Sequence, residues 1–191
     1  MRTKVAAIIL AAGQGSRIGQ PKLFLKTGDR TFLESVTKTL ADAGLADITA
    51  VVRNEDRERA AGLIQPRRVR VNGHPENGPL SSLRTGLDAQ KDRDGYLICP
   101  VDHPAVAADT IRALLAAFDA QRGNVVKPAF NGKAGHPVLI PAALAKRIPD
   151  KDIAGGLAKV IAGSGVAVTL VPVDDDAVLK NINTMDDIKH G

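Results

Sequence analysis

With 191 residues, of which 44% are hydrophobic and 25% charged, the chain has the composition of one globular domain, which we place at residues 1–191. It has no apolar run of the roughly 20 residues that a membrane span needs, no recognisable signal peptide and a single cysteine, so we expect a cytoplasmic protein without a membrane partner. A net charge of +5 with only 3% aromatic residues argues against a nucleic-acid partner and suits small anionic ligands such as phosphates.

Apolar runs of strand length alternate with helical patterns along the chain. Because the strands are apolar on both faces, the alternation predicts an α/β protein: a three-layer α/β/α sandwich around a mostly parallel, Rossmann-like sheet. We interpret residues 128–137 as a loop. The predicted strands are Val5–Leu10, Ile48–Val52, Val69–Val71, Tyr96–Cys99, Asn124–Pro128, His136–Ile140 and Val166–Val171, and the predicted helices are Thr31–Ala43, Leu80–Gln90 and Asp109–Gln121.

Local signals mark the ends of two of these helices. Thr31 and Glu34 have the spacing of a capping box, and Gly44 directly follows the same helix. Asp109 is a candidate N-cap for the third helix.

A glycine-rich loop with two cations, LAAGQGSRIGQPK at 10–22, follows the first strand. Ile18 replaces the third glycine of a dinucleotide fingerprint, and the Gly-Lys-Ser/Thr of a P-loop is missing. The glycines expose backbone N–H groups to anionic oxygens, while Arg17 and Lys22 add positive charge. This combination suits a triphosphate; the alternative is a structural turn with solvated basic residues.

The loop's pattern L-A-A-G-x-x-S-R-x-G-x-P-K resembles the signature of MobA-like nucleotidyltransferases and, within that class, of molybdenum cofactor cytidylyltransferases. Four later segments resemble further motifs of the family in the same order: NGPLSSLRTGL at 77–87, LICPVDHPAV at 97–106, GHPVLI at 135–140 and VLKNINTMDDI at 178–188. The resemblance implies a sheet of the nucleotide-diphospho-sugar transferase type and transfer of a nucleotidyl group to a phosphate-bearing acceptor.

The resemblance also implies which residues form the site. Asp102, at the predicted end of a strand, would be the principal ligand of Mg²⁺ (or Mn²⁺), with Asn183 as a second ligand; the alternative for Asp102 is a turn-forming aspartate. Arg17, Lys22 and Asp102 would be the catalytic residues. The implied nucleotide-binding residues are Leu10, Ala11, Ala12, Gly13, Gly15, Ser16, Arg17, Lys22, Pro79, Leu80, Ser81, Ser82 and Asp102.

Arg53, His136 and Asn181 are candidate contacts for the acceptor, although a solvated arginine and a structural hydrogen bond would explain the first two as well. The acidic run 174–176 is predicted to be a solvated loop, because consecutive side chains in a turn do not converge on one ion.

The choice of nucleotide draws on mixed signals. Ala12 and Pro21 are typical of relatives that use CTP, whereas Gly78-Pro79-Leu80 is typical of the guanylyl branch. We predict transfer of CMP from CTP to molybdopterin with release of pyrophosphate, with GTP as the alternative nucleotide and a sugar or polyol phosphate as the alternative acceptor. The segment Asn181–Met185 departs from the usual motif of the family at this position. A further alternative is therefore a non-catalytic chaperone that binds nucleotide and cofactor for a molybdoenzyme client.

Overall fold

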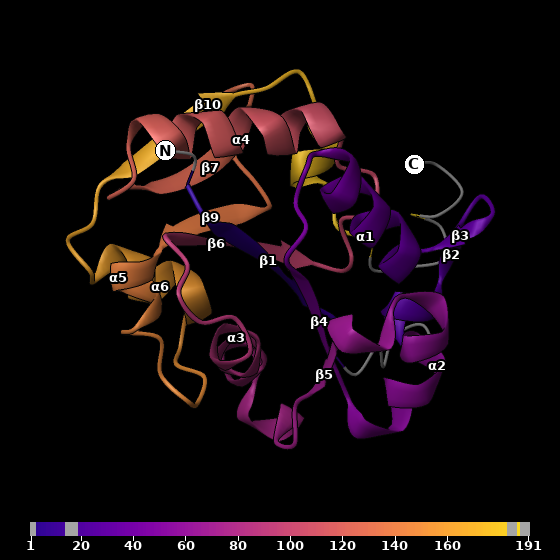
Figure 1. Cartoon of the computed structure of the whole chain (residues 1–191). Coiled ribbons are helices and arrows are strands. Elements are labelled where there is room, and N and C mark those ends of the chain that lie inside the picture. The colour runs from indigo at the N-terminus through magenta and orange to yellow at the C-terminus, as the bar shows by residue number, and fades with distance from the viewer. Residues whose placement is uncertain (1–2, 14–18, 183–186, 188–191) are drawn as a thin grey trace.

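The computed structural model describes residues 3–13, 19–182 and 187. At its centre lies an eight-stranded sheet whose main path runs β10-β7-β9-β6-β1-β4-β5, with β8 paired to β7 (Figure 1). A separate small sheet pairs β2 with β3. The strands are β1 (Val5–Leu10), β2 (Lys26–Thr27), β3 (Arg30–Thr31), β4 (Ile48–Val52), β5 (Val69–Val71), β6 (Gly95–Pro100), β7 (Val125–Phe130), β8 (Lys133–Ala134), β9 (Val138–Pro141) and β10 (Val168–Pro172).

The large sheet is mostly parallel. Strand β1 runs parallel to both β4 and β6, β4 runs parallel to β5, and β7 runs parallel to β10. Strand β9 lies antiparallel between β6 and β7. The carboxyl ends of β1, β4 and β6 therefore meet at one edge of the sheet. Open α/β sheets bind their ligands at this edge.

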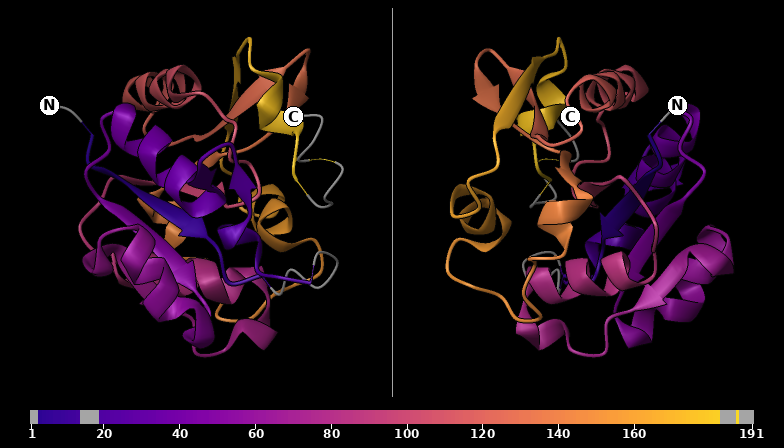
Figure 2. Two further views of the ribbon diagram at one scale, coloured as in Figure 1. Left: turned by 90° about the vertical axis from the view of Figure 1, so that its right-hand side faces the viewer. Right: turned by 60° about the vertical axis from the view of Figure 1, so that its left-hand side comes forward.

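Helices cover both faces of this sheet, as the views in Figures 1 and 2 show. None of the described helices is long and apolar enough to cross a membrane. The helices are α1 (Phe32–Asp42), α2 (Arg57–Leu63), α3 (Pro79–Asp88), α4 (Ala108–Ala120), α5 (Ala142–Ala145) and α6 (Gly156–Ala162), joined by short 3₁₀ turns that include η1 (Lys22–Phe24), η4 (Pro75–Asn77) and η5 (Asp176–Leu179).

Two apolar cores, one on each face, explain the three layers. Along β1, Ala7 and Ile9 belong to the core beneath α1, α2 and α4, whereas Ala6 and Ile8 belong to the core beneath α3, α5 and α6. Successive side chains of a strand point to opposite faces, so a strand that is apolar throughout serves both cores. The predicted α/β/α sandwich is confirmed.

The first three predicted strands and the first predicted helix agree closely with the structure. The structure places β1, β4 and β5 at the predicted bounds. At the start of α1 the Thr31 hydroxyl accepts from the Glu34 amide, and the Glu34 carboxylate accepts from the Thr31 amide. Gly44 follows the C-cap of α1 with φ of 92°, a conformation that glycine adopts without a steric cost.

The prediction of a loop at 128–137 is wrong for residues 128–134 and correct for residues 135–137. Strand β7 continues to Phe130 and turns back through Asn131 and Gly132 into β8. Both turn residues have positive φ, 48° and 76°. Asn-Gly is the pair that favours such a tight hairpin turn, so the sequence contained a signal for this hairpin.

Asp109 is not the N-cap of α4, because the cap is Ala107. The backbone N–H of Ala107 instead donates to the Asp175 carboxylate at 2.9 Å, and the Thr110 hydroxyl donates to the same oxygen at 2.6 Å. Asp175 thus caps α4 from a distant segment. The predicted solvated loop at 174–176 is wrong for this residue, whose carboxylate fixes the C-terminal segment to the helix.

Candidate functional site

The carboxyl ends of the central strands bring distant segments together. Ala11 follows β1 and donates its amide to the carbonyl of Val51 in β4 at 2.9 Å, and Val101 follows β6 and donates to the carbonyl of Leu10 at 3.1 Å. The beginning of the glycine-rich loop and Asp102 are therefore fixed at the same sheet edge. Leu10, Ala11, Ala12 and Gly13 lie at this edge, while Gly15, Ser16 and Arg17 fall outside the described residues.

Lys22 and Asp102 form an ion pair at this edge. The Lys22 Nζ lies 2.8 Å from Asp102 Oδ2, although the two residues are 80 positions apart. Lys22 opens η1, whose next two residues, Leu23 and Phe24, are buried and anchor the lysine. Each side chain of the pair remains 21% exposed, so a ligand can reach both charges.

The C-terminal segment is joined to Asp102 by its backbone. The N–H of Ile182 donates to the carbonyl of Asp102 at 2.9 Å, and the Ile182 side chain is buried in the core. Asn183, the second predicted metal ligand, follows Ile182 directly but falls outside the described residues.

Helix α3 begins beside the same edge with the predicted base-binding segment. Gly78, at its N-cap, has φ of 83°. A residue with a side chain would be strained in this backbone conformation. The Asn72 side chain donates to the hydroxyls of Ser81 and Ser82 at 2.8 and 2.9 Å. Leu80 packs into the core, and both serines are buried, so their hydroxyls hold the turn in shape. Asn72 was not predicted; its only signal is that it directly follows a strand.

A hollow of about 360 Å³ lies beside Asp102. It brings Asp102 together with two predicted acceptor contacts, His136 and Asn181, and with His103, to which the sequence assigned no function. Its other lining residues are Pro100, Ala134, Gly135, Val178 and Leu179. Arg53, the third predicted acceptor contact, does not line this hollow: it follows β4 and pairs with Glu55 at 2.7 Å.

Two histidines form one wall of the hollow. The ring centroids of His103 and His136 are 5.1 Å apart with planes inclined by 48°. His103 Nδ1 lies 3.3 Å from the carbonyl oxygen of Ala177. Burial lowers the pKa of His103 and lowers the pKa of His136 to about 4, the second aided by the neighbouring His103. Both rings are therefore uncharged near neutral pH.

The low pKa of His136 makes stability depend on pH. Between about pH 6.5 and pH 4 the unfolded chain binds a proton at this residue that the folded protein does not bind. We therefore expect the free energy of unfolding to fall by about 3 kcal/mol as pH falls through this window. Urea unfolding between pH 4 and 7 measures the slope. His136→Asn should flatten it, and an unchanged slope in that variant would contradict the assignment.

Gly135 is packed too closely for a side chain. Its N–H donates to the carbonyl of Pro128, His136 donates to the carbonyl of Val178, and a Cβ at position 135 would overlap that same carbonyl group. We expect Gly135→Ala to lower the free energy of unfolding by about 2 kcal/mol, because backbone must move to admit the methyl group. Urea denaturation measures the loss. Gly123→Ala, which meets open space, is the control, and equal stability of the two variants would refute the packing argument.

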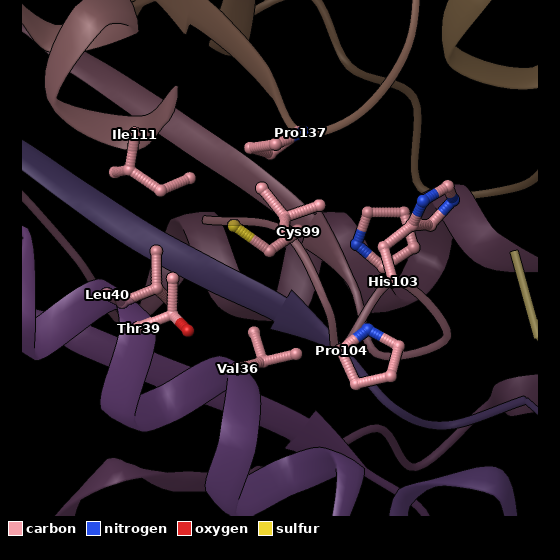
Figure 3. Close-up of a pocket in the computed structure, with 10 residues that line it drawn as sticks. Val36, Thr39, Leu40, Cys99, His103, Pro104, Ile111 and Pro137 are labelled. Carbon is pink, nitrogen blue, oxygen red and sulfur yellow. The ribbon is translucent and has the colours of Figure 1, made fainter. Parts of the chain in front are cut away.

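A second, much smaller pocket lies behind His103. Its volume is about 20 Å³, and apolar side chains from α1, β6 and α4 line it around Cys99 (Figure 3). Burial raises the pKa of the Cys99 thiol, which is therefore not ionised. This pocket is too small for a nucleotide, and Figure 3 shows the ring of His103 directed away from it.

The residues at this sheet edge fit a divalent metal that also binds phosphate. Asp102 is partly exposed and supplies a carboxylate at the sheet edge. Within the described part of the chain no three His, Cys, Asp or Glu side chains gather into a metal-binding group. Mg²⁺ commonly takes one or two protein carboxylates and completes its shell with substrate phosphates and water. One carboxylate next to the glycine-rich loop fits that pattern.

Residues 7–169 match the model of the MobA-like NTP transferase domain. The chain belongs to this family. A probable molybdenum cofactor guanylyltransferase from Bacillus mycoides is 33% identical over 150 residues, which cover 78% of this chain and 72% of that protein. The MobA-like chain is thus a nucleotidyltransferase by family.

Several solved structures share the fold of this chain. A nucleotidyl transferase from Methanothermobacter is 27% identical, with a TM-score of 0.79 over 98% of this chain and 95% of that one. The Rv0371c protein of Mycobacterium tuberculosis is 22% identical and superposes with a TM-score of 0.84 over 100% of this chain and 98% of its own. A manganese complex of that protein superposes with a TM-score of 0.80 at 21% identity, over 98% of this chain and 97% of the other.

Proposed function

We propose that this MobA-like nucleotidyltransferase transfers CMP from CTP to the phosphate of molybdopterin and releases pyrophosphate. The observation that carries the proposal is the Lys22–Asp102 pair, which joins the glycine-rich loop to the end of β6. A cation for phosphates and a carboxylate for a metal then share one partly exposed site. The family supports nucleotidyl transfer, and the motif residues Ala12 and Pro21 support CTP.

In this reaction an oxygen of the acceptor phosphate attacks the α-phosphorus, forming a new P–O bond as the bond to the leaving pyrophosphate breaks. The nucleophile is ionised near neutral pH, so no side chain has to remove a proton. The protein must instead bring two anions together and hold them in line. Lys22, with Arg17 in our proposal, places positive charge beside the phosphates and stabilises the charge that develops on the leaving group.

Asp102, with Asn183, would hold the divalent metal. When bound, Mg²⁺ screens the repulsion between the two phosphates and polarises the α-phosphate. The ion pair with Lys22 keeps the Asp102 carboxylate in place at the sheet edge. The hydrogen bond from the Ile182 N–H to the Asp102 carbonyl holds Ile182, the residue before Asn183, beside Asp102.

GTP is the second candidate nucleotide, because the Bacillus mycoides relative is named a guanylyltransferase and Gly78-Pro79-Leu80 is typical of that branch. Ala12, which is buried just beyond the end of β1, is typical of relatives that use CTP and keeps CTP as the first candidate.

Pyrophosphate release tests the proposal directly. We expect release with CTP and magnesium only when molybdopterin is present, and at least tenfold more slowly with GTP. A preference for GTP would identify a guanylyltransferase. Turnover with a polyol phosphate would identify that compound, and not molybdopterin, as the acceptor. Nucleotide binding without any turnover would favour a carrier that delivers the cofactor to a molybdoenzyme.

A further inference from the structure

We infer that strand β10 pairs with β10 of a second copy of this chain, antiparallel and across a two-fold axis at Leu170, so that two sheets join into one. The inference goes beyond the proposed function, because none of the residues that carry it belongs to the candidate site. Its basis is the difference between the two edges of the large sheet, which are β5 and β10. Figure 1 shows these two strands on opposite sides of the molecule.

The edge at β5 is protected against pairing, whereas the edge at β10 is not. Strand β5 has three residues, and its middle residue is the exposed Arg70. Short length and a charged side chain are devices by which proteins keep an edge strand from pairing with another chain. Strand β10 has five residues, none of them charged, and its exposed large side chains, Val168 and Leu170, are aliphatic. Such an edge is a template for a further strand.

The backbone of β10 offers hydrogen-bonding groups along this edge. The carbonyl of Ala167 accepts from β7 at 2.9 Å, and the amide of Val173 donates to β7 at 3.0 Å. Backbone groups of alternate residues in a strand point to opposite edges, so the N–H and C=O groups of Val168 and Leu170 point away from β7. In the described part of the chain, β7 is the only strand that pairs with β10.

The side chains of Val168 and Leu170 form an apolar strip beside this edge, and they are 45% and 47% exposed. Val168 is in register with Val125, which belongs to the core beneath α3, α5 and α6, so the strip lies on that face of the sheet. In a pair centred on Leu170, the two leucines lie opposite each other and Val168 lies opposite Pro172 of the second copy. The two strips then shield each other from water.

The charges at the two ends of β10 favour the antiparallel direction. The acidic run 174–176 follows the strand, and at its start Arg147 donates to the Ser164 carbonyl at 2.8 Å. Antiparallel pairing brings the acidic end of each strand to the basic end of the other, whereas parallel pairing would place two acidic ends together. A two-fold pair uses the open edge of both copies, so the assembly closes at a dimer.

The concentration dependence of the dimer tests the inference. One strand pair with two side-chain strips is at the small end of specific interfaces, and we expect a reversible dimer with Kd of roughly 10–100 µM. Sedimentation velocity of the full chain measures it. Leu170→Lys sets like charges against each other at the two-fold axis and should raise Kd at least tenfold. Ile153→Lys makes a similar change at a position that is 40% exposed outside β10 and should leave Kd unchanged.

Cysteine cross-linking tests the register. In the proposed pair the two Cα atoms of residue 170 lie about 5.5 Å apart, which is within the range of a disulfide. The natural cysteine, Cys99, is buried, so Leu170→Cys supplies the accessible thiol. Oxidation with copper phenanthroline should convert this variant to a covalent dimer on a non-reducing gel. Ile153→Cys is the matched control and should remain monomeric on the gel.

Three results would overturn the inference: a wild type that stays monomeric up to about 500 µM, an unchanged Kd in Leu170→Lys, or cross-linking that is equally efficient in Ile153→Cys. The first result would leave β10 to a different protein chain. Melting temperatures show that each variant is folded. Because these measurements use no nucleotide and no acceptor, their failure is distinct from failure of the pyrophosphate assay.

Discussion

Asp102→Asn is expected to reduce kcat for nucleotidyl transfer by a factor on the order of a thousand. The substitution preserves the size of the side chain but removes the charge that would hold the metal and that pairs with Lys22 at 2.8 Å. Electrostatic groups aimed at reacting phosphates contribute on the order of 100- to 1000-fold each, and loss of the metal ligand adds to this. Pyrophosphate release under saturating CTP measures the effect.

The matched control for this variant is Asp174→Asn, which removes the same charge from an exposed loop position. It should retain full activity. If Asp102→Asn stayed within tenfold of the wild type while its melting temperature was unchanged, Asp102 would be a turn residue and the metal would be held elsewhere.

Lys22→Ala is expected to lower the transfer rate about a hundredfold, because it removes the positive charge placed beside the phosphates. Leu23 and Phe24 anchor η1 independently of the lysine, so the fold should persist. Single-turnover measurements separate this loss of rate from weaker binding of CTP. Lys26→Ala removes an exposed lysine from β2 and serves as the control.

The double variant sharpens this second prediction. Two groups that act as one unit are strongly non-additive, so Lys22→Ala combined with Asp102→Asn should be little slower than Asp102→Asn alone. Multiplicative losses would mean that the two charges act on different steps. A Lys22→Ala rate equal to that of the wild type would remove the lysine from the mechanism.

The layers of the fold could be predicted because their cause is local. Val5–Leu10 is apolar at every position and Ile48–Val52 at every position but Thr49, a pattern that a sheet buried on both faces explains. Helices α2 and α6 were missed because each is seven residues long and buries a single side chain, Ala60 or Ile161, which is too little to show a helical period.

The site was predictable only in part. The sequence identifies Lys22 and Asp102 as candidates, but their 2.8 Å contact depends on the packing of β6 against β1 across 80 residues. His103 could not be assigned, because its role depends on the carbonyl of Ala177 in η5, a partner that no spacing in the chain indicates. Arg53 looked equally suitable from its place after a strand, yet its side chain pairs with Glu55 instead.

The position of β9 has a consequence for the order in which the protein forms during synthesis. Strands β1, β4, β5 and β6 are neighbours in the sheet and all precede residue 101, so a nascent chain can assemble them as a parallel unit first. β9 must then enter at the open flank of β6 before β7 and β10 can dock. Ile182 reaches Asp102 last, so a polypeptide still emerging from the ribosome assembles the strands before the C-terminal segment completes the hollow beside Asp102.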